Sequence, residues 1–281
     1  MSKPPPLKGR FVRDRSFSDR GPSQRRGPPP PPGRRTDEDD PDDFGPTWVW
    51  GIHAALACLA NPARKIERVL ASRNAALRLP EGAPPDGVEL QMHDPASMDG
   101  MLPPGAVHQG LAVRAWPLEP WELSKLATPP DGRPVLVLDQ ITDPQNVGAL
   151  FRSAAAFGAR GLVMQDRKSP PLTGALAKAA AGAIETVPHA RVANIARTIE
   201  GLKNWGYVTV GLEGEAGLSL ADALKDKRPA ALVLGAEGKG LRELVGETCE
   251  RRARIPIAPG MDSLNVSVAG AIALYETARK S

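Results

Sequence analysis

Polar side chains cluster at three junctions in the second half of the chain, where an apolar run gives way to a loop or a helix. The three segments are Asp139-Gln-Ile-Thr-Asp-Pro-Gln-Asn-Val-Gly-Ala-Leu-Phe-Arg152, Gly235-Ala-Glu-Gly-Lys-Gly240 and Met261-Asp-Ser-Leu-Asn-Val-Ser-Val-Ala269. In open α/β sheets, ligands bind outside the carboxyl ends of the strands. Amide, carboxylate, hydroxyl and guanidinium groups at such junctions are therefore candidates to orient a ligand.

The first segment supports a structural and a functional interpretation equally. Asn146 opens a predicted helix and could cap it, with Arg152 paired to Asp139 or Asp143. Alternatively, Arg152 could reach a phosphate or a carboxylate from a helix that follows a parallel strand. Gly148 permits another backbone to approach closely.

The other two segments are weaker signals when each is taken alone. Glu237 could hydrogen-bond a hydroxyl or an amine, or it could be an exposed carboxylate in a glycine turn. Ser263 is expected to cap the last helix, and Asn265 in its first turn could orient a ligand.

Several common chemistries do not fit the chain. Glu237 stands at the second glycine of a dinucleotide fingerprint, and Lys239 is followed by Gly240 where a P-loop requires Ser or Thr. No G-x-S-x-G elbow occurs, and no histidine follows His189, which argues against a nucleophilic serine. The two cysteines, Cys58 and Cys249, form no CxxC motif and are expected to be buried free thiols. We expect no metal.

Alternating apolar strands and helices position the three segments. Short continuous apolar strands separated by helices predict a parallel sheet buried on both faces. The expected strands are 135–139, 161–164, 207–212, 231–234 and 255–258, and the expected helices are 146–157, 172–184, 195–205 and a C-terminal helix with Leu264, Val268, Ile272 and Tyr275 on one side.

The chain divides by composition into four parts. Residues 1–46 form a tail rich in Pro and Arg with an acidic block, which cannot bury enough apolar surface to fold. Residues 47–118 form a small α/β unit in which His53 and His108 are expected to be turn or cap residues. A proline-rich linker with a short helix follows at 119–132, and 133–281 is the second unit. The tail is either a basic arm for RNA or dispensable.

Together, the three segments resemble the three motifs of the SpoU/TrmH branch of the SPOUT superfamily. The first motif matches at Asn146, Gly148 and Arg152. The matches of the second and third motifs lie at Gly235, Glu237, Gly238 and Gly240, and at Ile255-Pro256 with Ser263, Leu264, Asn265 and Val266. Members transfer a methyl group from S-adenosylmethionine to a ribose 2′-hydroxyl of RNA. The motifs appear in family order across about 133–279.

The first unit extends the resemblance. Gly51–Leu56 (GIHAAL) and His108-Gln109-Gly110 are similar to the substrate-binding domain of the subfamily that methylates a guanosine of bacterial 23S ribosomal RNA. That domain resembles small ribosomal proteins that bind RNA. The implied fold class is α/β: a C-terminal trefoil-knot methyltransferase domain, a small N-terminal RNA-binding domain and a disordered tail.

The resemblance also implies site residues and partners. Asn146, Arg152, Glu237, Ser263 and Asn265 would be catalytic, whereas Gly235, Ile255 and Leu264 would bind S-adenosylmethionine. Such enzymes are homodimers with residues of both subunits at one site. The family proposal makes Arg152 the base, but a guanidinium stays protonated in proteins, so we favour a positioning or charge-stabilising role.

Two alternatives stay open: a transfer RNA substrate and a non-catalytic RNA-binding factor with this fold. A third, a dinucleotide-dependent enzyme, has the failed glycine fingerprint against it. The net charge of +4 favours an anionic partner but does not establish one. No apolar run approaches the roughly 18 residues of a membrane span, so we expect a cytoplasmic protein that binds RNA and no membrane.

Overall fold

The computed structural model describes residues 45–279, except 173 and 262. The predicted tail, 1–46, lies outside the described residues apart from its last two positions. Two β-sheets account for the strands of the described part, one of four strands and one of seven. None of the described helices is long and apolar enough to cross a membrane.

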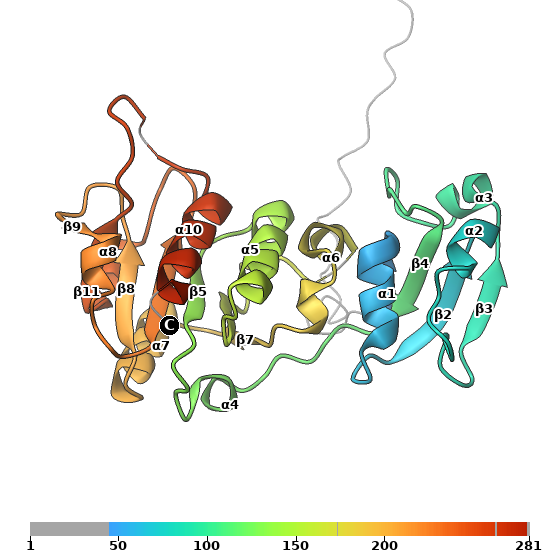
Figure 1. Cartoon of the computed structure of the whole chain (residues 1–281), viewed down its shortest axis with the longest axis horizontal. Coiled ribbons are helices and arrows are strands. Elements are labelled where there is room, and N and C mark those ends of the chain that lie inside the picture. Colours follow the sequence, from blue (N-terminus) through green and yellow to red (C-terminus); the bar gives the residue numbers. More distant parts are fainter. Residues whose placement is uncertain (1–44, 173, 262, 280–281) are drawn as a thin grey trace, which may run out of the picture. The chain divides into compact units, whose positions relative to one another are not determined.

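The first sheet has the strand order β1-β4-β2-β3. Figure 1 shows β4, β2 and β3 next to one another in this order. The β1–β4 and β4–β2 pairs are antiparallel, and the β2–β3 pair is parallel. The elements of this part are β1 (Thr47–Trp50), α1 (Ile52–Ala60), β2 (Ile66–Ala71), α2 (Arg73–Ala76), β3 (Glu89–Met92), α3 (Pro95–Asp99) and β4 (Leu111–Ala115).

Alternation along these strands gives the first sheet two different faces. Val49, Val69 and Val113 belong to the core cluster that includes buried residues of α1. Leu70 and Ala112 point the other way and pack with Met98 of α3 in a separate cluster. One face is thus covered by α1, and part of the other face is covered by α3.

His108 begins a turn, as expected, whereas His53 lies inside α1, whose N-cap is Gly51, and is neither a cap nor a turn residue. The Nδ1 atom of His108 accepts a hydrogen bond from the Gly110 backbone N–H at 3.0 Å, and its Nε2 lies 3.1 Å from Asp99. The side chain of Gln109 accepts from the backbone N–H of Ile52 at the start of α1, at 3.2 Å. Gln109 has a φ of 55°, and β4 begins two residues later at Leu111. His53 is exposed on α1.

The second sheet is parallel throughout, in the order β7-β6-β5-β10-β8-β11-β9. Its parts are α4 (Leu123–Ala127), which lies in the predicted linker, then β5 (Val135–Asp139), α5 (Pro144–Ala156), β6 (Gly161–Gln165), α6 (Gly174–Ala180), the 3₁₀ turn η1 (Ala183–Glu185), β7 (His189–Val192), α7 (Ile195–Asn204), β8 (Val208–Leu212), β9 (Leu218–Ser219), α8 (Leu220–Ala223), β10 (Ala230–Gly235), α9 (Glu243–Thr248), β11 (Arg251–Arg254) and α10 (Val266–Ala278).

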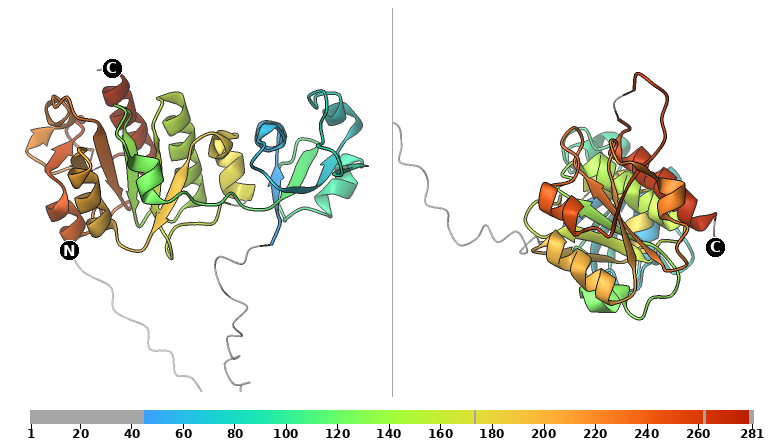
Figure 2. Two further views of the ribbon diagram at one scale, coloured as in Figure 1. Left: turned by 90° about the horizontal axis from the view of Figure 1, so that it is seen from below. Right: turned by 90° about the vertical axis from the view of Figure 1, so that its left-hand side faces the viewer.

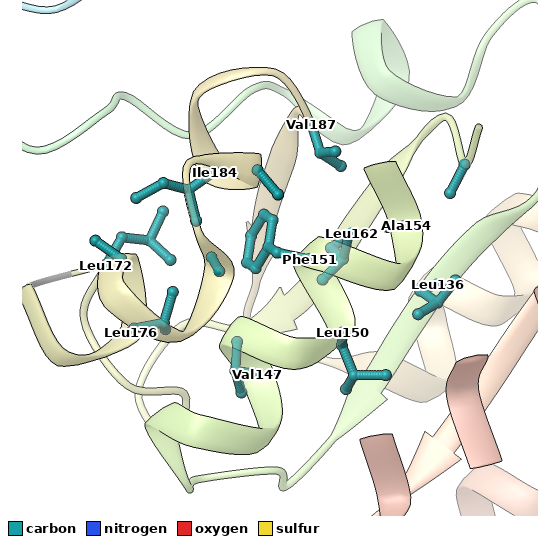
Figure 3. Packing of buried hydrophobic residues seen from close by; sticks show 14 of the residues in the cluster. Leu136, Val147, Leu150, Phe151, Ala154, Leu162, Leu172, Leu176, Ile184 and Val187 are labelled. Atoms are coloured by element: carbon teal, nitrogen blue, oxygen red, sulfur yellow. The ribbon is translucent and has the colours of Figure 1, made fainter. Parts of the chain in front are cut away.

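Helices cover both faces of this sheet, as the continuous apolar strands predicted (Figure 2). Leu136 and Leu138 of β5 pack with Leu150 of α5 and Leu274 of α10 on one face. The intervening residues Val135 and Val137 join a second cluster, which includes buried residues of α7 and α9. Figure 3 shows the first of these clusters around Phe151.

Close helix packing depends on two glycines. A Cβ at Gly148 of α5 would lie 2.5 Å from the Cβ of Ala179 and 2.7 Å from the carbonyl oxygen of Leu176. A Cβ at Gly270 of α10 would lie 2.3 Å from Leu150. The close approach of another backbone predicted at Gly148 is confirmed.

The strand predicted at Ile255–Ala258 is wrong. The strand of this region is β11, which pairs with β8 and β9 through Arg251–Arg254. Pro256 has no backbone N–H to donate to a ladder, so the apolar residues that follow Arg254 form a loop. That loop lines the pocket described below.

Several helix boundaries also differ from the predictions. Asp143 caps α5, which begins at Pro144 and not at Asn146. The alanine-rich helix predicted over 172–184 ends at Ala180, where Ala181 and Gly182 take positive φ values of 50° and 92°. At the C-terminal helix, Leu264 precedes α10.

The side of α10 that the sequence marked as apolar does not face the sheet. Val268 and Tyr275 are 47% and 51% exposed, whereas Gly270, Ala273 and Leu274 are buried.

Candidate active site

Three polar side chains from distant segments meet at the carboxyl end of the second sheet. Oε1 of Glu237 accepts hydrogen bonds from the Nδ2 groups of Asn146, at 3.1 Å, and of Asn265, at 2.5 Å. Asn265 also donates to Oδ1 of Asn146 at 3.0 Å. The backbone N–H of Val266, at the start of α10, reaches the same Glu237 oxygen at 3.3 Å. One carboxylate therefore fixes two amide side chains and one helix terminus.

Local structure explains why these side chains are available. Asp143 caps α5, which leaves the buried Asn146 free to turn its amide towards Glu237. Asn265 is the N-cap of α10, and its Oδ1 accepts from Ser267 N at 2.9 Å while its Nδ2 faces the network. Ser263, which was expected to cap this helix, is exposed and does not do so.

A buried carboxylate closes the glycine loop between β10 and α9. Gly235, the last residue of β10, pairs with Asp139 at the end of β5. The Asp139 carboxylate, whose side chain has 0% exposure, accepts from the Arg242 backbone N–H at 3.1 Å and from Nε at 2.9 Å, and Nη2 lies 2.7 Å away. Inside the loop, Gly240 N donates to Ala236 O at 2.8 Å. Asp139 thus holds both ends of the loop that carries Glu237.

This loop forms one wall of an open pocket of about 890 Å³. The opposite walls come from the ends of β8 and from the loop that follows β11. Its lining includes the three predicted cofactor positions, Gly235, Ile255 and Leu264, together with Glu237, Ser263 and Asn265. Glu213 and Glu215 add two acidic side chains to the rim. The volume lies in the range of small-molecule and cofactor sites.

The structure brings together four of the five predicted catalytic residues and leaves Arg152 apart. Arg152 is exposed on α5, six residues beyond Asn146. Six helical residues correspond to about 9 Å along the axis and about 120° of rotation, so Arg152 projects to a different side of the helix. The pairing of Arg152 with Asp139 that the sequence left open does not occur, because Asp139 binds Arg242.

Sequence reasoning missed Arg242 and the two rim glutamates. In the sequence, Arg242 follows the glycine loop and has the character of an ordinary surface residue. Its partner Asp139 is evident only in the structure, where the end of β5 lies beside the start of α9. The available signal was Asp139 itself, a carboxylate at the end of a fully apolar strand that needs a cation.

The two cysteines offer no nucleophile for the site. Both are free and buried, as predicted. Burial raises the pKa of the Cys58 thiol and that of the Cys249 thiol to about 12. Within the described residues, no group of three or more His, Cys, Asp or Glu side chains could hold a metal ion.

Known proteins match this chain over nearly all of its described length. The profile of the SpoU rRNA Methylase family matches residues 133–275. The chain belongs to this family. A second profile, named RNA 2′-O ribose methyltransferase substrate binding, matches residues 48–121.

Two bacterial relatives of the chain carry the same name. The 23S rRNA (guanosine-2′-O-)-methyltransferase RlmB of Vibrio cholerae is 39% identical over 246 residues, which cover 83% of this chain and 96% of the relative. RlmB of Pseudomonas aeruginosa is 36% identical over 249 residues, with the same two coverages.

Solved structures of this family share the fold. The SpoU methyltransferase AviRb of Streptomyces viridochromogenes superposes with a TM-score of 0.70 at 20% identity, covering 84% of this chain and 90% of that chain. An rRNA methyltransferase of Sinorhizobium meliloti with bound AdoMet gives a TM-score of 0.69 at 22% identity, covering 84% and 87%.

Proposed function

We propose that this protein transfers a methyl group from S-adenosylmethionine to the ribose 2′-hydroxyl of a guanosine in 23S ribosomal RNA. Family membership, together with relatives that are named for this reaction and match across 96% of their own length, supports the proposal. The observation that carries it is the Asn146–Glu237–Asn265 network beside an 890 Å³ pocket, because it assembles all three sequence motifs at one place.

The pocket residues fit the proposed cofactor. Ile255, Ile257 and Leu264 offer apolar surface for a planar base, and the carboxylates of Glu213 and Glu215 complement a cation. A Cβ at Gly235 would lie 2.1 Å from the Gly240 backbone, so the loop is closed tightly enough to present backbone groups to the pocket. When bound, S-adenosylmethionine would supply an electrophilic methyl group on a sulfonium.

The chain's own residues would orient the attacking hydroxyl. A ribose hydroxyl is a poor nucleophile unless its proton leaves as the new bond forms, and the reacting atoms must be held about 3 Å apart. The side chain of Glu237 aligns Asn146 and Asn265 through hydrogen bonds, and these amides would hold the ribose. Ser263, at the pocket edge, adds a hydroxyl donor and acceptor. Arg152 would position a phosphate or stabilise charge near the hydroxyl.

Arg152 suggests a site shared between two copies of the chain. It projects away from Asn146 of its own chain. In a homodimer in which α5 and α10 of the two copies face each other, Arg152 of one copy would lie beside the Asn146–Glu237–Asn265 network of the other. The exposed apolar residues Val268 and Tyr275 on α10 support this interface, since Tyr275 packs edge-on against Phe157 and leaves half of its surface uncovered. α5 and α10 lie side by side in Figure 1.

The proposed organisation assigns RNA binding to residues 47–118 and methyl transfer to 133–281, joined by 119–132, in a cytoplasmic protein. Its test is transfer of labelled methyl from S-adenosylmethionine to separated pools of large-subunit ribosomal RNA and transfer RNA. Label on a ribose of ribosomal RNA is expected. Label only in transfer RNA would overturn the substrate, and no label together with no cofactor binding would favour a non-catalytic RNA binder.

A mixing experiment tests the shared site. Arg152→Ala and Asn265→Ala chains are each expected to lose turnover by orders of magnitude while the Arg152→Ala chain still binds the cofactor. If the site is shared, mixed dimers contain one site with both residues, so co-refolding the two chains restores about a quarter of the wild-type rate. No restoration in dimers shown to be mixed would place both residues in one subunit.

A further inference from the structure

One half-face of the first sheet carries side chains that are only partly buried, among them Trp48, which packs at the margin of the cluster under α3. Trp48, Arg68 and Arg114 lie on the same face as Leu70 and Ala112, because alternate residues of a strand share a face. Leu70 and Ala112 are buried under Met98 of α3. Trp48, Arg68 and Arg114 remain partly exposed, and the two arginine side chains keep 36% and 37% of their surface.

The three exposed residues form one row across neighbouring strands. Trp48 of β1 is the register partner of Arg114 of β4, and Arg114 is the partner of Arg68 of β2. Like charges directly opposite each other on adjacent strands destabilise a sheet by roughly 0.2–1 kcal/mol. Two facing guanidiniums are therefore an arrangement that sheet stability alone disfavours.

A local irregularity of β2 places one carboxylate beside the arginine pair. The register shifts between Ile66 and Arg68, so Glu67 is an extra residue in the strand. Such bulges re-aim side chains and occur next to functional sites. Oε1 of Glu67 lies 3.1 Å from Nη2 of Arg68, and Oε2 lies 3.3 Å from Nε of Arg114. Each arginine receives one oxygen of Glu67, so a single carboxylate serves both guanidiniums. Glu89 of β3, the register partner of Arg68, ends the row on its other side.

This geometry suits a phosphate group flanked by a base. Guanidinium groups bind phosphate through paired N–H donors, and an aromatic ring beside them offers a stacking surface for an unpaired base. Lys65, whose Nζ lies 4.9 Å from the centre of the exposed Trp116 ring, adds a third cation and a second aromatic ring at the same end of β2 and β4.

We propose that Trp48, Arg68 and Arg114 form an RNA-contact row, and that Glu67 occupies the phosphate position until RNA replaces it. This inference rests on the proposed function and assigns its RNA contact to one half-face of the first sheet. In the free protein, Glu67 then holds the two guanidiniums together by offsetting their mutual repulsion. It also competes with RNA for the arginines, so only RNA that binds tightly enough displaces its carboxylate.

The test is equilibrium binding of a 23S ribosomal RNA transcript between 50 and 200 mM salt. Arg68→Gln/Arg114→Gln is compared with Arg133→Gln/Arg279→Gln. The control removes the same charge from arginines that are 55% and 56% exposed and paired with single carboxylates. Each lost phosphate contact lowers the salt slope by about 0.7–0.9. The row variant should therefore bind about tenfold more weakly with a slope lower by about 1.5, and the control should retain its slope.

Glu67→Gln provides a readout of opposite sign. If the carboxylate holds the phosphate position, its removal tightens RNA binding several-fold and steepens the salt dependence, which a merely structural role for Glu67 would not produce. In all variants, affinity for S-adenosylmethionine should stay at the wild-type value, which also verifies that the second sheet is folded.

The outcomes separate this inference from the proposed function. A wild-type protein that methylates the transcript, with the row variant and the control equally weakened, would overturn the RNA-contact row and leave the enzyme assignment standing. Weaker binding by Glu67→Gln would overturn the role of its carboxylate. Failure of the wild-type protein to bind the transcript at all would remove the proposed substrate and the row together.

Discussion

The buried pair of Asp139 and Arg242 gives the sharpest test of how the site is built. In Arg242→Met, the Asp139 carboxylate keeps its hydrogen bond from the backbone N–H but loses the guanidinium contacts at 2.7 and 2.9 Å. Breaking a fully buried ion pair by removing one partner costs about 3–5 kcal/mol. Arg242 is 44% exposed, so water screens the pair and we expect about 2 kcal/mol.

Two assays measure the consequence. In urea unfolding followed by circular dichroism, Arg242→Met should lose about 2 kcal/mol of unfolding free energy, which corresponds to about 4–8 °C in Tm for a protein of this size. In calorimetry, S-adenosylmethionine affinity should fall about tenfold, because the loop carrying Gly235 and Glu237 is released at one end.

A double-mutant cycle provides the control. Asp139→Asn removes the charge from the other side, so the variant carrying both substitutions should be more stable than the sum of the single losses predicts, with a coupling of about 1 kcal/mol or more. An Arg242→Met protein within about 0.5 kcal/mol of wild type, with unchanged cofactor affinity, would refute the idea that this pair holds the loop.

Four further predictions follow from single contacts. Glu237→Gln keeps an acceptor but loses the charge shared by three N–H donors, so turnover should fall about 10–100-fold with little change in Tm; steady-state kinetics at saturating RNA measures this, and an unchanged rate would contradict the role of the carboxylate. Glu185→Gln leaves the Arg64 guanidinium, which has 1% exposure, without its charge partner and should cost about 3 kcal/mol in urea unfolding, and a loss below about 1 kcal/mol would contradict the estimate. Burial, reinforced by Arg191 and Arg64, lowers the pKa of His189 to about 4, so the unfolded chain binds the proton more tightly than the folded chain. The free energy of unfolding should therefore fall by about 3 kcal/mol, relative to a His189→Met variant, as the pH drops from ~6.5 towards 4. Unfolding free energies of the two proteins that run parallel over this pH range would contradict the prediction. Neither Cys58 nor Cys249 should react with a thiol reagent at pH 8 until the protein unfolds, and rapid labelling of the native protein would show that burial is incomplete.

Local sequence patterns predicted most helices and strands because the residue types within a short stretch largely determine which of the two forms. The apolar runs at β5, β6 and β10 and the glycine positions of α5 and α10 follow from burial and close packing, which the residue types express directly. The strand placed at Ile255–Ala258 was wrong because apolar character alone does not separate a strand from a pocket wall. Here the ladder needed the backbone N–H groups of Arg251–Arg254, although three of these four residues carry charged side chains.

The sequence by itself determined which side chains are candidates for the chemistry and which alternatives its motifs argue against. Asn146, Glu237 and Asn265 are set by residue type and position at the ends of strands and helices, and the absence of a dinucleotide fingerprint or a serine elbow is also a property of the sequence.

Only the tertiary structure decided which side chains meet. The hydrogen bonds of the network join residues 91 and 119 positions apart, and their partners depend on strand order, which no local pattern encodes. The same holds for Arg242, which finds Asp139 only because β5 and β10 are neighbours, and for Arg68 and Arg114, which face each other only through the register of β2 and β4. Hydrogen bonds and ion pairs act over a few ångströms, so their partners are fixed by folding and not by distance along the chain.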